Sequence, residues 1–150
     1  MAEYCTYLDV SNRLTEAGVT FCADTDQSGA VDPSESSAHV DTAIVYAGQE
    51  IDFAVVNNRK GLILSSVRAA GNAFLKQIAI DLASERLCTI GGMTTPDSIS
   101  EAAARAREML LRVENGKDVP GLTYPLQSDG QHSRSYPGVV NPKPLRIRRC

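Results

Sequence analysis

The clearest hydrophobic pattern in the chain predicts one long helix. Apolar residues recur every three or four positions, at Val40, Ile44, Ala47, Ile51 and Val55. This spacing places them on one face of an α-helix. Asp32 suits the N-cap, Pro33 suits the first helical position, and Glu35 completes a capping-box pattern. We expect the helix to end near Val56, because the polar run 57–61 that follows is typical of a turn.

Weaker patterns predict three further helices. A short first helix should be capped by Asp9 and ended by Gly18. A third helix should start at Ser65 or Ser66 and reach about Cys88. Its expected apolar positions are Ala70, Phe74, Leu75, Ile78, Leu82 and either Ala83 or Leu87.

The last predicted helix begins at a capping-box pattern, Ser98–Glu101, and ends at Gly116. Met109, Leu110 and Val113 should form its buried stripe. The expected fold class is therefore all-α: a small bundle of about four helices, two of them long. The helical domain should span residues 1–116.

The composition changes after Gly116. Residues 117–150 contain five prolines and few large apolar residues, so we predict an extended, proline-rich, basic C-terminal arm. The arm has six Lys or Arg and two acids, whereas residues 1–116 have nine basic and sixteen acidic residues. This asymmetry favours an acidic protein pocket over DNA as the target of the arm, because the acidic domain repels DNA. The candidate partner-binding residues are Arg134, Lys143, Arg146, Arg148 and Arg149. Leu145 and Ile147 could also add a short strand to a neighbour's sheet.

Residues 24–35, "DTDQSGAVDPSE", match the loop of a calcium-binding EF-hand. The pattern needs oxygen ligands at fixed positions and a glycine at the sharp turn. The candidate calcium ligands are Asp24, Asp26, Ser28, the Ala30 carbonyl, Asp32 and Glu35. The loop occurs once, and the preceding "VTFCA" is β-branched and aromatic, which disfavours an entering helix. The loop can therefore be either a structural cation site or a simple turn into the long helix.

Other chemistry is not indicated. No nucleophile elbow, phosphate loop or zinc-ligand spacing occurs, so we predict neither catalytic activity nor a bound cofactor. The four cysteines are scattered, which indicates free thiols and synthesis in a reducing cytoplasm. Asp81 and Glu85, near Arg86, are interpreted as a solvated helix face. Neither a signal peptide nor a membrane span is expected.

Five stretches carry a family resemblance. They are "EYCTYLDVSNRL", then "DTDQSGAVDP" leading to "AIVYAGQEIDFAV", then "FLKQIAIDLASERLC", and finally "ARAREMLLRVENGKDVPGL". Ile51 and Asp52 stand where the family has an "EIDGYL"-like stretch. In this order the stretches resemble the neck, or head-to-tail connector, adaptor family of tailed bacteriophages, including small proteins found beside Mu-like head genes. The resemblance covers roughly residues 4–125.

The resemblance implies a structural protein of the virion neck, made in the host cytoplasm. Such adaptors form a ring, usually dodecameric, beneath the portal, and they continue the DNA channel. The implied partners are the portal protein, neighbouring copies, and downstream neck or tail proteins, while DNA passes through without sequence-specific binding. The alternative is a calcium-binding interaction module that uses the single EF-hand-like loop.

Overall fold

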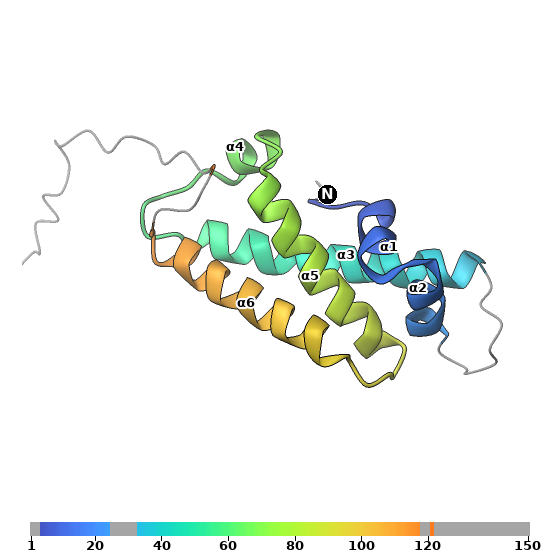
Figure 1. Ribbon diagram of the computed structural model, residues 1–150. Helices are drawn as coiled ribbons and strands as arrows, with labels where there is room; N and C mark the ends of the chain where they lie inside the picture. The colour runs from blue at the N-terminus through green and yellow to red at the C-terminus, as the bar shows by residue number, and fades with distance from the viewer. Residues whose placement is uncertain (1–3, 25–32, 118–120, 122–150) are drawn as a thin grey trace, which may run out of the picture.

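The structure is a computed structural model, and it describes residues 4–24, 33–117 and 121; for residues 33–36 and 69 it describes the backbone alone. All secondary structure in these residues is helical, which confirms the predicted all-α class (Figure 1). The helices are α1 (Tyr7–Leu14), α2 (Glu16–Ala23), α3 (Pro33–Val56), α4 (Leu64–Ala69), α5 (Ala73–Ile90) and α6 (Asp97–Glu114).

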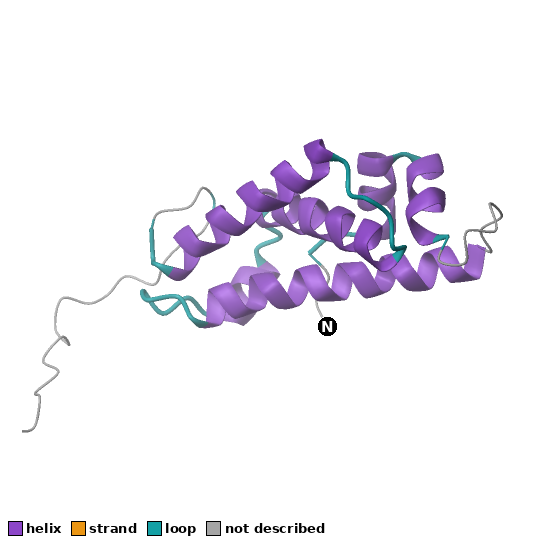
Figure 2. Cartoon of the chain, turned by 90° about the horizontal axis from the view of Figure 1, so that it is seen from below, coloured by secondary structure: helices purple, strands orange, loops and turns teal. Residues whose placement is uncertain are grey.

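Three long helices, α3, α5 and α6, make up most of the bundle, and α5 also packs against α1 and α2. Figure 2 shows α1 and α2 side by side, both lying against one end of α3. The predicted apolar face of α3 is confirmed, since each of its five positions is buried. Ile51, Leu75 and Leu82 are among the largest fully buried side chains. Burial of a side chain of this size contributes roughly 1.5–3 kcal/mol.

The predicted first helix is in fact two helices. Thr6, not Asp9, is the N-cap of α1, and Asp9 is its capping-box partner: the Asp9 carboxylate accepts a bond of 2.9 Å from the Thr6 N–H. The chain then turns at Thr15, which has a φ of 68° and caps α2 by accepting from the Gly18 N–H at 3.2 Å. Gly18 therefore lies in the first turn of α2 and does not end a helix, so that prediction was wrong.

The predicted third helix is also interrupted. Helices α4 and α5 are separated by residues 70–72, where Gly71 has a φ of 55°. Asn72 caps α5, because its Oδ1 accepts from the Phe74 N–H at 2.8 Å. Ser65 and Ser66 lie inside α4, and the exposed Ala70 is not part of the buried face. The remaining predicted positions of that face are buried, except for the half-buried Phe74.

The last helix starts one residue before its predicted cap. Pro96 is the N-cap of α6, so Ser98–Glu101 lies within the helix and the capping-box prediction was wrong. The end is as expected, because Gly116 has a φ of 67°, the left-handed conformation that favours glycine at a helix end. The predicted stripe is confirmed, with Leu110 and Val113 buried and Met109 half-buried.

The turn after α3 is tied to the end of α6. The Asn58 side-chain amide donates to the Val113 carbonyl, and the Arg59 N–H donates to the Glu114 carbonyl at 3.0 Å. Asn58 is itself buried. The two bonds hold the C-terminal ends of α3 and α6 side by side.

Two ion pairs join α1 to α5. Arg13 Nε lies 3.3 Å from Asp81 Oδ1, and Lys76 Nζ lies 2.8 Å from Asp9 Oδ1. The hydrogen bond with Lys76 lowers the pKa of Asp9. Asp81 is therefore a half-buried partner at a helix contact, and the predicted solvated face was wrong for this residue. Of the predicted arm, only Lys117 and Gly121 belong to the described residues.

Candidate interaction surface

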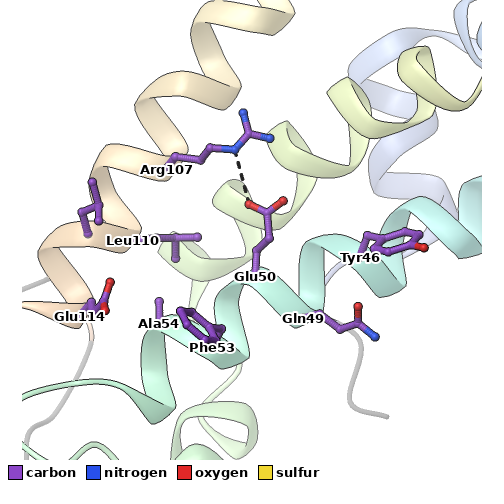
Figure 3. A pocket seen from close by; sticks show the side chains of 9 residues that line it. Tyr46, Gln49, Glu50, Phe53, Ala54, Arg107, Leu110 and Glu114 are labelled. Carbon is purple, nitrogen blue, oxygen red and sulfur yellow. Dashed lines mark ion pairs between the residues drawn. The ribbon is translucent and has the colours of Figure 1, made fainter. Parts of the chain in front are cut away.

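An apolar groove lies on the surface between α3 and α6 (Figure 3). It has a volume of about 550 Å³. Its lining residues are Tyr46, Gln49, Glu50, Phe53 and Ala54 from α3 and Arg107, Leu110, Leu111 and Glu114 from α6. Phe53 is 67% exposed and Leu111 is 56% exposed. Large apolar side chains gathered in a hollow on the surface are typical of a binding site for another polypeptide.

The groove arises from a second apolar face on α3. Tyr46 and Phe53 are seven residues apart, which is two helical turns, so they lie on one side of the helix. This side is adjacent to the core face. Ala54 and Leu110 are buried and form the floor, and the small Ala54 side chain leaves the space above it unfilled. The groove thus depends on the small side chain of Ala54 between the larger side chains of Phe53 and Leu110.

One arginine fixes the groove wall. Arg107 Nε lies 3.5 Å from Glu50 Oε2, the pair drawn in Figure 3, and its terminal NH₂ donates to Glu85 Oε2 at 2.5 Å. These pairs join α6 to α3 and to α5, and the bond to Glu85 raises the pKa of Arg107. Glu85 is therefore the α5 partner of an ion pair with α6, and the predicted solvated face was wrong for this residue too. Glu50 and Glu114 outnumber the single arginine, so the lining residues have a net negative charge.

Tyr46 closes one end of the groove and is itself held in place. The Arg86 guanidinium carbon lies 4.4 Å from the centre of the Tyr46 ring, at the distance of a cation–π contact. Tyr46 remains 45% exposed. The contact limits the rotation of the ring without covering it.

A second polar cluster fastens the start of the chain to the bundle. The Tyr4 hydroxyl donates to Asp52 Oδ1 at 2.7 Å, and Arg68 Nε donates to the same oxygen at 3.2 Å. Arg68 also donates through its NH₂ to Asp52 Oδ2. Burial, followed by the bond to Asp52, raises the pKa of Tyr4, so the hydroxyl keeps its proton. Tyr4 and Asp52 come from two of the stretches that carry the family resemblance, and the fold brings them into contact.

Two thiols meet between α2 and α5. The Sγ atoms of Cys22 and Cys88 are 3.0 Å apart, and both residues are buried. The hydrogen bond with Cys88, together with burial, raises the pKa of the Cys22 thiol. Of the described cysteines, Cys22 and Cys88 are free thiols, as predicted. Cys150 lies outside the described residues.

The predicted calcium ligands are placed only in part. Asp24 is the C-cap of α2, and its N–H donates to the Thr20 carbonyl at 3.1 Å. Asp26, Ser28, Ala30 and Asp32 lie outside the described residues, as does the side chain of Glu35. Within the described residues, no group of three or more His, Cys, Asp or Glu is placed to hold a metal ion. The calcium site therefore stays a prediction.

The residues before the loop differ from expectation. "VTFCA" (19–23) is helical and forms the last part of α2, although its composition disfavours a helix. Tertiary packing explains this, because Val19, Cys22 and Ala23 are all buried. The loop sequence 24–35 is thus preceded by α2, and its last three residues belong to α3.

The arm residues Arg134, Lys143, Arg146, Arg148 and Arg149 lie outside the described part of the chain. In the part that is described, no helix combines the length and hydrophobicity needed to span a membrane. Sequence reasoning missed the groove between α3 and α6. The spacing of Tyr46 and Phe53 on the long helix, off its core face, was the available signal.

Comparison with protein-family models gives a match over most of the chain. A family model described as "Bacteriophage Mu, Gp36" matches residues 4–135, a range that includes every helix of the structure. No curated protein and no solved structure matches significantly.

Proposed function

Because this chain belongs to the bacteriophage Mu Gp36 family and is thereby a structural protein of the phage head region, we propose that it is a neck adaptor. In this role, copies of the chain form a ring beneath the portal, join the capsid to tail components and continue the DNA channel. Its partners are the portal protein, neighbouring copies, and downstream neck or tail proteins. The chain acts as a structural part and not as an enzyme.

The observation that carries this proposal is the groove between α3 and α6. A protein that works alone in water gains nothing from leaving Phe53 and Leu111 exposed, whereas a subunit of an assembly can bury them against its partners. In a ring, each contact is repeated by rotation, so one such surface on every copy suffices. The ion pairs of Arg107 with Glu50 and Glu85 hold α3, α5 and α6 together, so the groove is formed before a partner binds.

The charge of the domain also suits a DNA channel. Residues 1–116 contain sixteen acids and nine basic residues, and an acidic wall does not hold phosphates. DNA that must slide through a ring needs such a surface, because clustered cations would bind its backbone. The charge pattern supports the adaptor proposal without requiring any sequence-specific contact.

The test is assembly with the portal. We expect the purified chain to bind purified portal from the same phage and to appear as a ring beneath it by electron microscopy. Phe53→Asp should weaken assembly at least tenfold, because it places a charge in the apolar groove. Phe21→Asp is the matched control, since Phe21 is 61% exposed on α2 and is not part of the groove.

An absence of portal binding, together with virions that show no density for the chain at the vertex, would refute the adaptor role. Equal loss of assembly in the Phe53 and Phe21 variants would instead show that the groove has no special part in it.

A second candidate function is a calcium-binding interaction module. It is favoured by the arrangement of α2 and α3: α2 ends directly before the EF-hand-like loop sequence 24–35, and α3 begins at its tenth position, Pro33. Asp24, Asp26, Ser28, Ala30, Asp32 and Glu35 would supply the ligands. Calorimetry should then show calcium binding below millimolar concentration, and Asp26→Asn should remove it. Titration without heat in that range would eliminate this function.

A further inference from the structure

We propose that the groove between α3 and α6 binds the C-terminal segment 143–149 of this same polypeptide, "KPLRIRR". The ligand class is an extended peptide with alternating apolar and basic side chains. The family match does not assign a ligand to the groove or a target to this segment.

The groove has the two properties that such a peptide needs. Its floor and walls are apolar, formed by Ala54, Leu110, Phe53 and Leu111. Its lining charges are two glutamates and one arginine; Arg107 pairs with Glu50, so the net negative charge is that of Glu114. An apolar ligand with positive charges is therefore preferred over a neutral or acidic one.

The segment has the complementary pattern. Leu145 and Ile147 alternate with Arg146 and Arg148. In an extended chain, alternate side chains point to opposite faces, so Leu145 and Ile147 would share the face toward the groove floor. The long Arg146 and Arg148 side chains start on the other face and would bend back to bring their charges to the glutamates at the groove rim. The apolar pair would be roughly 7 Å apart along the segment. Pro142 and Pro144 favour an extended backbone at the start of the segment.

The connection is long enough. Twenty-one residues (122–142) lie between the last described residue, Gly121, and Lys143. An extended chain of that length spans up to roughly 70 Å, whereas α3 is about 36 Å long. The segment can therefore reach the groove of its own copy or of an adjacent one. DNA is a poor rival ligand, because the net negative charge of the groove repels phosphates.

Photo-crosslinking of the full-length chain tests the proposal. The photoreactive residue p-benzoylphenylalanine replaces Phe53, whose ring it resembles. After illumination, mass spectrometry should find crosslinks to residues 143–149. The same photoreactive residue at Phe21 is the control and should give no crosslink to this segment.

Tail variants make the test specific. Leu145→Asp combined with Ile147→Asp should lower the crosslink yield from position 53 at least tenfold, because both charges would enter an apolar floor. Val139→Asp combined with Val140→Asp, outside the segment, should leave the yield unchanged. Circular dichroism should show the same helix content in all of these chains.

Crosslinks that map elsewhere, or that persist at full yield in the Leu145 and Ile147 variant, would overturn the proposal. The result is separate from the neck-adaptor role, because the crosslink needs no portal. A chain that crosslinks as expected but fails to bind portal would refute the adaptor role alone.

Discussion

Asp52 shows how a single side chain can hold three parts of the chain together. Its carboxylate accepts hydrogen bonds from Tyr4, before α1, and from Arg68 in α4, while Asp52 itself belongs to α3. The side chain is 24% exposed, so these bonds form in a partly dry environment. The start of the chain and the short helix α4 depend on it.

We expect Asp52→Ala to lower the free energy of unfolding by about 1–3 kcal/mol, because both partners lose a charged acceptor. Tyr4→Phe should cost about 1 kcal/mol, since it removes one hydrogen bond. Urea unfolding of both single variants and the double variant gives the coupling energy. If the two effects simply added, Tyr4 and Asp52 would not be coupled and the bond would contribute nothing in solution.

Single residues also show what the sequence could and could not predict. The core face of α3 was predictable, because its spacing alone identifies Val40, Ile44 and Ile51 as buried. The Tyr4–Asp52 contact was not predictable, because 48 residues separate the two and no local pattern reports such a distance. The calcium ligands were suggested by spacing, but ligation depends on loop geometry outside the described residues.

At the scale of helices, the close contact of α2 with the end of α5 depends on one glycine. A Cβ atom added at Gly91 would lie 1.9 Å from the Cys22 carbonyl oxygen and 2.8 Å from its carbon. Both neighbouring atoms are backbone, so they cannot rotate away. The absence of a side chain at Gly91 therefore permits the approach of α2.

We predict that Gly91→Ala lowers the free energy of unfolding by about 1–3 kcal/mol or more, because this is the usual cost of forcing extra volume into a packed site. Gly48→Ala is the matched control. Gly48 lies within α3, and a Cβ atom added there would meet the Tyr4 side chain at 3.8 Å, an ordinary van der Waals distance. That control should be neutral or more stable by up to about 1 kcal/mol, since alanine favours helix. Thermal unfolding of both chains would decide, and an unchanged Gly91→Ala protein would contradict the packing.

Helix breaks were the least predictable elements. The chain turns at Thr15, a non-glycine residue with positive φ, whereas Gly18 looked like the stop and is helical. Asn72 caps α5, although two serines upstream looked like better candidates. In each case several residues could serve locally, and the tertiary contacts of α2 and α5 selected one.

For the whole molecule, the described core lies between Cys5 and Val113. A chain ending at Gly121 should therefore keep its helical content and unfold cooperatively, and its free energy of unfolding should fall only by what the binding of segment 143–149 contributes. Circular dichroism and urea unfolding of the two chains provide the measurement. Loss of cooperative unfolding on truncation would show that residues 122–150 belong to the folded core.

The contact between Cys22 and Cys88 also allows the opening of the α2–α5 contact to be measured by thiol labelling. Both sulfur atoms are buried where α2 meets α5, so a thiol reagent in solution reaches them only when that contact opens. The rate of labelling at these two positions, compared between the free subunit and an assembled particle, would report how often α2 detaches. The cysteine pair thus converts a rare motion of one short helix into a chemical modification that mass spectrometry can time.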